Sequence, residues 1–194
     1  MSLVGFAVAG GRSERMGRDK ALLPWGGTDL LGHALARLFG LTDDVRILCG
    51  PRLRYEDRGV PVVADRIEDA GPIAGILAGL ETAGGRAALF LAVDLPLVPI
   101  PLLAHLAACC PGFDAVVPVS PRGVEPLCAV YGPACLEPVR RRVDAGERKM
   151  TLFWPDVRVH EVGPDELLAF GEPKALFQNV NAPEDYTFSR ARTG

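Results

Sequence analysis

This sequence contains no apolar run long enough to cross a lipid bilayer. Its longest runs, such as Ala87 to Val93, are far shorter than the roughly 20 residues of a spanning helix. The first residues, MSLVGFAVAGG, also lack the basic start and long apolar core of a secretory signal. We therefore expect a soluble, cytoplasmic protein with no membrane partner.

The chain also lacks an overall excess of positive charge. Its 21 Lys and Arg residues are outnumbered by 24 Asp and Glu residues, which gives a formal net charge of -3. Because a surface that coats nucleic acid needs a basic excess, nucleic acid is not expected as a partner. A local excess of Arg and Lys between Arg12 and Lys20 instead predicts a small anionic ligand.

Cysteine and histidine do not form a recognisable metal-binding pattern. The cysteines are odd in number, without a CxxC or Cys/His metal spacing: Cys49, Cys109, Cys110, Cys128 and Cys135. The histidines are scattered and form no cluster: His33, His105 and His160. These patterns predict free thiols in a reducing compartment, and histidines with surface or core roles.

Strand and helix patterns alternate through the first half of the chain. Its 194 residues, 48% of them hydrophobic, suffice for one domain with a proper core. Four apolar runs predict strands: Val4–Val8, Val45–Cys49, Val60–Ala64 and Ala87–Val93. Helices are predicted from an N-cap at Thr28 to Gly40 and after Gly71-Pro72. This βαβ alternation implies a parallel sheet with right-handed crossovers.

The second half has a less regular pattern. Its predicted elements are a helix at Pro101–Cys109, strands at Ala115–Val119 and Pro126–Tyr131, a helix at Pro133–Ala145, an edge strand at Val157–Val162, an extended segment at Phe177–Asn181 and a helix that opens at Pro183. No repeat, low-complexity tract or linker divides the chain. We therefore expect a single domain of residues 1–194.

A glycine-rich, basic loop follows the first predicted strand. It contains three glycines (Gly10, Gly11 and Gly17) and the cations Arg15 and Lys20. Glycine lets backbone N–H groups approach phosphate oxygens, and Arg or Lys adds full positive charge there. The loop is neither a Walker loop nor a GxGxxG motif. A simple turn is the alternative, but the glycines and cations together favour a nucleotide phosphate site.

Two carboxylates end predicted strands at the same edge as this loop. Ligands of parallel sheets bind at the carboxyl ends of the strands, which brings Gly10, Gly50, Asp65 and Asp94 together. Asp94 is predicted to hold Mg²⁺, with capping of the next turn as the alternative. Asp65 is predicted to contact the nucleotide, although a turn role or a partnership with Arg66 also fits.

Amides and cations in the second half suggest a further substrate. Asn179 and Asn181 flank Val180 in an extended segment, so both amides would face one side and could bind a heterocycle. An Asx-turn or N-cap before Pro183 is the alternative for Asn181. Arg148 and Lys149 form either a solvated turn or an anion site.

These motifs together resemble the molybdenum-cofactor guanylyltransferases, a branch of the nucleotidyltransferase superfamily. The resemblance rests on six segments in the family's order: Ala9–Leu23, Gly71–Gly75, Asp94–Pro96, Glu125–Leu127, Ala145–Lys149 and Asn179–Asp185. Val8 stands where the family usually has Leu, and Gly50 lies near a position that is often polar. The resemblance implies a single Rossmann-like α/β domain, with a mostly parallel central sheet flanked by helices.

The resemblance also implies a reaction. A molybdopterin terminal phosphate would attack the α-phosphorus of GTP and expel pyrophosphate, with Mg²⁺ as the cofactor. The nucleotide half, residues 1–100, would use Val8, Ala9, Gly10, Gly11, Lys20, Asp65 and Asp94. Arg15, Lys20 and Asp94 would be catalytic, and Asp94 would hold the metal. The pterin half, residues 101–190, would use Arg148, Lys149, Asn179 and Asn181. Transient contact with molybdoenzymes or cofactor-insertion proteins would follow.

Three other functions remain open from the sequence. A cytidylyltransferase acting on the same cofactor would have a loop resembling AAG, where this chain has AGG. A sugar-phosphate nucleotidylyltransferase should lack the Asn179-Val180-Asn181 segment. A non-catalytic nucleotide-binding adaptor would need neither Lys20 nor Asp94. All three differences favour the guanylyltransferase interpretation.

Overall fold

Two six-residue strands lie at the centre of the sheet, β1 (Leu3–Val8) and β6 (Ala87–Ala92). They pair in parallel, from Leu3 opposite Ala87 to Val8 opposite Ala92. All six residues of β6 and the four inner residues of β1 are buried, so both strands are near-continuous apolar runs in the sequence. The computed structural model describes residues 2–10, 19–65 and 71–180.

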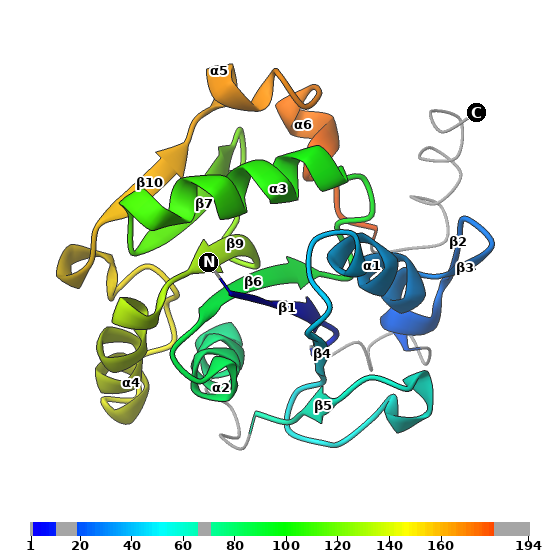
Figure 1. Cartoon of the computed structure of the whole chain (residues 1–194), viewed down its shortest axis with the longest axis horizontal. Helices are drawn as coiled ribbons and strands as arrows, with labels where there is room; N and C mark the ends of the chain where they lie inside the picture. The colour runs from blue at the N-terminus through cyan, green and yellow to red at the C-terminus, as the bar shows by residue number, and fades with distance from the viewer. Residues whose placement is uncertain (1, 11–18, 66–70, 181–194) are drawn as a thin grey trace.

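Further strands extend the sheet on both sides (Figure 1). They are β4 (Val45–Leu48), β5 (Val62–Val63), β7 (Ala115–Ser120), β8 (Gly123–Val124), β9 (Cys128–Tyr131) and β10 (Val159–Val162). The order is β10-β7-β9-β6-β1-β4-β5, with β8 paired to β7. Strands β6, β1, β4 and β5 are parallel, whereas β9 is antiparallel to β6 and β7. The predicted α/β fold with a mostly parallel sheet is confirmed.

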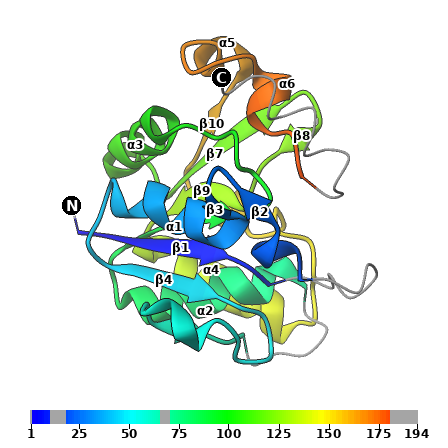
Figure 2. The same cartoon turned by 90° about the vertical axis from the view of Figure 1, so that its right-hand side faces the viewer.

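Helices cover both faces of this sheet. They are α1 (Leu30–Phe39), α2 (Pro72–Ala83), α3 (Ile100–Cys109), α4 (Leu136–Asp144), α5 (Pro164–Leu167) and α6 (Pro173–Leu176). Helices α1 and α3 lie on one face, and α2 and α4 lie on the other (Figures 1 and 2). The buried side chains form two clusters accordingly, one that includes Leu31 and Leu103 and one that includes Ile76 and Val139. No helix among the described residues is long and apolar enough to cross a bilayer.

Short elements complete the described chain. Five 3-10 turns are η2 (Lys20–Leu22), η3 (Glu56–Arg58), η4 (Cys110–Gly112), η5 (Pro133–Cys135) and η6 (Trp154–Asp156). A two-stranded antiparallel hairpin, β2 (Pro24–Trp25) with β3 (Thr28–Asp29), leads into α1. The predicted N-cap at Thr28 is wrong by one residue, because the Asp29 carboxylate accepts the Gly32 N–H at 2.7 Å.

Several predicted boundaries also differ from the observed ones. The strand predicted at Val60–Ala64 is reduced to two residues, and the one at Pro126–Tyr131 begins only at Cys128. The predicted helix at Pro133–Ala145 begins as the turn η5 and becomes α-helical at Leu136. Proline explains part of these late or shortened element starts, since it lacks the N–H that a sheet or a helix interior needs. The helix predicted to open at Pro183 lies outside the described residues.

The prediction that the histidines form no cluster is wrong for two of them. His105 on α3 and His160 on β10 both lie beside Glu166 on α5, with His105 Nε2 at 2.5 Å and His160 Nε2 at 3.7 Å from its carboxylate oxygens. Glu166 follows α3 by many residues in sequence, so spacing along the chain conceals this proximity. The fold brings these side chains together when β10 pairs with β7.

Candidate active site

Backbone contacts join the carboxyl ends of β1, β4 and β5. The N–H of Ala9 donates to the carbonyl of Leu48 at 2.8 Å, and the N–H of Asp65 donates to the carbonyl of Gly50 at 3.1 Å. Gly10 lies so close to Gly50 that a Cβ on Gly10 would stand 2.9 Å from the Gly50 nitrogen. Glycine is therefore required at this crossing, and the predicted convergence of these strand ends is observed.

Lys20 and Asp94 form a close ion pair at this edge. Lys20 Nζ lies 2.8 Å from Asp94 Oδ2, and the two side chains are 19% and 25% exposed. Residue 20 opens η2, whereas Asp94 follows strand β6, so the contact spans 74 residues of sequence. The pair presents one cation and one carboxylate at the same point, the two groups that a metal–phosphate complex binds.

Asp19 fixes the start of η2 and thereby the position of Lys20. Its carboxylate accepts hydrogen bonds from the Ala21 N–H at 3.1 Å, the Tyr55 hydroxyl at 2.7 Å and the Arg54 guanidinium at 3.2 Å. Arg54 also donates to the carbonyl of Cys49 at 3.0 Å. Sequence reasoning assigned no role to these three side chains. Asp19 lies within the family motif Ala9–Leu23, and an aspartate can cap the turn that follows it, but no spacing along the chain points to Arg54 or Tyr55, which lie 35 and 36 residues further on.

Helix α1 supports the loop that follows Asp94. The buried guanidinium of Arg37 donates to the carbonyls of Leu95 at 3.1 Å and Val98 at 2.5 Å. His33 donates through Nε2 to the carbonyl of Pro96 at 3.0 Å. Arg37 is only 6% exposed, and burial lowers its pKa to about 10. Sequence reasoning missed Arg37, because helical periodicity does not distinguish a buried arginine from a solvated one.

Glu125 is a second carboxylate close to Asp94. Burial raises its pKa, and the charge of Asp94 adds to that effect. The Ser120 hydroxyl donates to Glu125 Oε1 at 2.7 Å and holds it. The sequence showed Glu125 only as part of a motif, without a role of its own. Two carboxylates and Lys20 thus share this region.

The segment before Asn181 reaches the Asp94 loop. The N–H of Val180 donates to the carbonyl of Asp94 at 3.0 Å. Arg122 Nη2 donates to Asn179 Oδ1 at 3.1 Å and also to the carbonyl of Phe177. Asn179 is therefore next in the chain to a residue that contacts the Asp94 loop, and Arg122 is its observed partner.

Asp65 and Arg148 border the first turn of α2. A Cβ built on Gly75 would lie 3.9 Å from Asp65 Oδ2, and one built on Gly71 would lie 4.0 Å from the Arg148 Cβ. Gly71 has a φ of +72°, which favours glycine at this helix start. Burial raises the pKa of Asp65. Arg148 thus approaches the same edge as Asp65, with Lys149 next to it in the chain.

Three of the predicted site residues lie outside the described residues. They are Gly11, Arg15 and Asn181. Of the others, Val8 is the last residue of β1, and its carbonyl accepts the Val93 N–H at 3.2 Å. Val8 and Ala9 therefore lie next to the segment that leads to Asp94. The described nucleotide candidates lie at adjoining strand ends.

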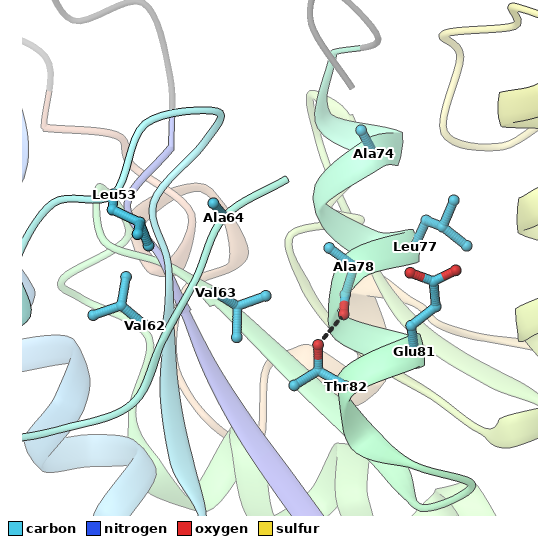
Figure 3. A pocket seen from close by; sticks show the side chains of 9 residues that line it. All are labelled: Leu53, Val62, Val63, Ala64, Ala74, Leu77, Ala78, Glu81 and Thr82. Carbon is cyan, nitrogen blue, oxygen red and sulfur yellow. Dashed lines mark hydrogen bonds between the residues drawn. The ribbon is translucent and has the colours of Figure 1, made fainter. Parts of the chain in front are cut away.

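A separate groove of about 570 Å³ lies between β5 and α2 (Figure 3). Its walls are mostly apolar side chains, including Val63 from β5 and Leu77 from α2. The described residues that line it include one acidic group, Glu81, and no basic one. Arg140 pairs with Glu81 at 3.1 Å. The groove offers phosphate no counter-charge, unlike the region around Lys20.

Comparison with known proteins finds relatives that match most of the chain. Residues 5–157 match the family model described as the MobA-like NTP transferase domain. The chain is 33% identical to a probable molybdenum cofactor guanylyltransferase of Pelotomaculum thermopropionicum, over 100% of this chain and 97% of the relative. It is 35% identical to one of Deinococcus radiodurans, over 95% and 92%.

A solved structure has the same fold over nearly the whole chain. It is molybdopterin-guanine dinucleotide biosynthesis protein A from Archaeoglobus fulgidus, with a TM-score of 0.77 and 25% sequence identity. The match covers 97% of each chain.

Proposed function

This nucleotidyltransferase belongs to the MobA-like NTP transferase family, and we propose that it transfers GMP from GTP to the terminal phosphate of the molybdenum–molybdopterin cofactor. The products are the guanine dinucleotide form of the cofactor and pyrophosphate. The observation that carries the proposal is the 2.8 Å contact of Lys20 with Asp94 beside the glycine crossing of β1 and β4. The names of the relatives support the choice of both substrates.

The nucleotide lies along the carboxyl ends of β1, β4 and β5 in this proposal. Gly10 and Gly11 let the backbone approach the phosphates, and Val8 and Ala9 precede them at the end of β1. Lys20 supplies positive charge to the phosphate oxygens. The Asp65 carboxylate, which burial has already partly dehydrated, accepts hydrogen bonds from the nucleoside.

The donor set around Asp94 fits a magnesium ion. Mg²⁺ prefers carboxylate and phosphate oxygens. The carboxylate of Asp94 is a quarter exposed, and its charge also reaches Glu125. Asp94 is the residue that would hold the ion. When bound, Mg²⁺ would neutralise the negative charge that develops on the phosphate groups.

The pterin substrate binds on the other side of Asp94 in this proposal. Arg148 and Lys149 attract its phosphate, and the amides of Asn179 and Asn181 contact its heterocycle. The hydrogen bond from the Val180 N–H to the Asp94 carbonyl supports this arrangement, because it keeps the segment that contains Asn179 next to the reacting phosphates. Arg122 orients Asn179 through its side-chain oxygen.

The reaction needs positioning and charge neutralisation, with no covalent enzyme intermediate. A phosphate oxygen of molybdopterin forms a bond to the α-phosphorus of GTP, and the bond from that phosphorus to the β-phosphate oxygen breaks. Lys20 and Arg15 stabilise the negative charge that passes to the departing pyrophosphate. Arg148 and Lys149 hold the attacking phosphate in line, and Asn179 and Asn181 position the heterocycle to which it is attached.

The test is pyrophosphate release with each of the four nucleoside triphosphates, with and without molybdopterin. We expect release only with GTP and molybdopterin together, since the acceptor phosphate is the attacking group. A preference for CTP would contradict the guanine assignment. Equal release without molybdopterin would contradict the acceptor, and release with a sugar phosphate in its place would identify the acceptor instead.

A further inference from the structure

Three side chains of different chemistry converge where α5 meets α3. His105 and Cys109 are four residues apart on α3, which places them on one face of the helix. Glu166 comes from α5. His105 Nε2 lies 2.5 Å from Glu166 Oε1 and 3.7 Å from Cys109 Sγ, and the three ligand atoms all lie within 4.8 Å of one another.

We propose that His105, Cys109 and Glu166 bind a zinc ion, with water as a fourth ligand. Imidazole nitrogen, thiolate sulfur and carboxylate oxygen are the ligands zinc takes in proteins, and three of them with one open position form a known coordination type. The harder Mg²⁺ prefers oxygen and would not select a thiolate. The site is thus chemically distinct from the carboxylates near Lys20.

The observed separations are close to those of a zinc centre. Zinc bonds of ~2.0–2.1 Å to nitrogen or oxygen and ~2.3 Å to sulfur, at tetrahedral angles, separate nitrogen from sulfur by about 3.5 Å and nitrogen from oxygen by about 3.3 Å. The nitrogen–sulfur distance of 3.7 Å already agrees. The 2.5 Å contact between His105 and Glu166 would open by less than ~1 Å to admit the ion.

Neighbouring groups hold these ligands in place. His160 Nε2 lies 3.7 Å from Glu166 Oε2, the carboxylate oxygen that does not contact His105. Phe113 stacks on His160 at 4.7 Å between ring centroids, and Phe170 packs against His105 at 5.1 Å. Such partners of metal ligands tune affinity and orientation. The side chains of His105 and Glu166 are 31% and 37% exposed, so an ion can enter from solvent.

The zinc site is separate from the proposed transfer reaction. Helix α3 begins at Ile100, shortly after Asp94, and Cys109 is its last residue, which at ~1.5 Å per residue lies about 13 Å further along. An ion at this position would link α5 to α3, and with α5 also the end of β10, which precedes it in the chain (Figure 1). The zinc ion would stabilise this part of the fold, whichever substrates the enzyme uses.

Metal titration of the untagged chain tests the site. The protein is freed of metal with a chelator and titrated with Zn²⁺ or Co²⁺ in excess Mg²⁺, which occupies sites made of oxygen alone. We expect one equivalent of Zn²⁺ to raise the unfolding temperature. We also expect Co²⁺ to give the near-ultraviolet charge-transfer band of a cobalt–thiolate bond.

Matched variants identify the ligands. Cys109→Ser should abolish the cobalt–thiolate band, and His105→Gln should weaken Zn²⁺ binding by at least about tenfold. Cys110→Ala, which removes the adjacent buried thiol, and Asp94→Ala should both retain the band and the affinity. A band that survives in Cys109→Ser, or no zinc binding by the wild type, would overturn the proposal. Circular dichroism verifies that each variant is folded.

Discussion

The Asp94 carboxylate contacts Lys20 through Oδ2, and its charge reaches Glu125. Removing it takes away the proposed metal ligand and leaves Lys20 without this counter-charge. We expect Asp94→Ala to lose nearly all pyrophosphate release at any Mg²⁺ concentration. Asp43→Ala, which removes an exposed aspartate in the loop between α1 and β4, is the matched control. Full turnover by Asp94→Ala would remove this residue from the mechanism.

The Lys20 ammonium is predicted to act on the phosphates in the transition state. Loss of a charge-assisted contact in a partly buried site should reduce kcat/KM by roughly 30-fold, equivalent to about 2 kcal/mol. Steady-state kinetics of Lys20→Ala would measure this. Lys174→Ala, on the exposed surface of α6, should keep the wild-type kcat/KM. Equal kinetics for the two variants would contradict the role of Lys20.

The ionised Asp65 side chain is predicted to lower the stability of the folded protein while it contributes to GTP binding. Burial raises its pKa, so the folded state binds the proton more tightly than the unfolded chain. Its ionised form therefore costs stability once the pH rises above the ordinary aspartate value of about 3.9. Asp65→Asn should raise the Tm at neutral pH and weaken GTP binding. The gain in Tm should disappear as the pH falls to about 4.

Asp114 provides a control of opposite sign. Hydrogen bonds from the Arg158 side chain hold the pKa of this carboxyl below its usual range. The stability that it contributes is present above the unfolded pKa and is lost as the pH falls. Asp114→Asn should therefore lower the Tm at neutral pH, with a smaller effect in acid. Thermal unfolding across this pH range checks both variants, and shifts of the same sign would contradict the argument.

At the scale of elements, α1 determines the position of the loop after β6. Arg37 Nη1 donates to two loop carbonyls while its Nε donates to the carbonyl of His33 at 3.4 Å, and lysine has only one nitrogen for these contacts. Arg37→Lys should lower the Tm by about 4–8 °C, equivalent to about 2 kcal/mol for a chain of this size, and should also lower kcat. Thermal unfolding and kinetics measure the two effects. Arg141→Lys, on an exposed part of α4, should change neither the Tm nor kcat. A wild-type Tm for Arg37→Lys would show that these hydrogen bonds do not stabilise the loop.

Element types were predictable from periodicity, whereas element ends depended on contacts. The apolar runs of β1 and β6 identify buried strands directly, because no residue in their interiors can face water. The Thr28 cap was misplaced because Thr28 and Asp29 are both good caps, and the hydrogen bond from the Gly32 N–H to Asp29 decides between them. The antiparallel direction of β9 also depends on tertiary pairing, since periodicity carries no direction.

At the scale of the whole molecule, one sheet joins the two predicted halves. Strand β6 of residues 1–100 pairs along its length with β9 of residues 101–190. Neither half can bury its side of this pairing alone, so we expect a single cooperative thermal transition. Calorimetry should give equal calorimetric and van't Hoff enthalpies. Two separated transitions would show that the halves are independent folding units.

The sequence by itself determined the α/β class and the acidic end of β6, and it predicted a nucleotide loop, because these are local patterns read along a strand and its following turn. It also carried the motifs of the family. Only the tertiary structure decided which distant groups touch: Lys20 with Asp94, Arg37 with the loop after it, and Glu166 with two histidines. The physical reason is that such contacts depend on strand order and on helix positions relative to the sheet, and no spacing along the chain encodes either.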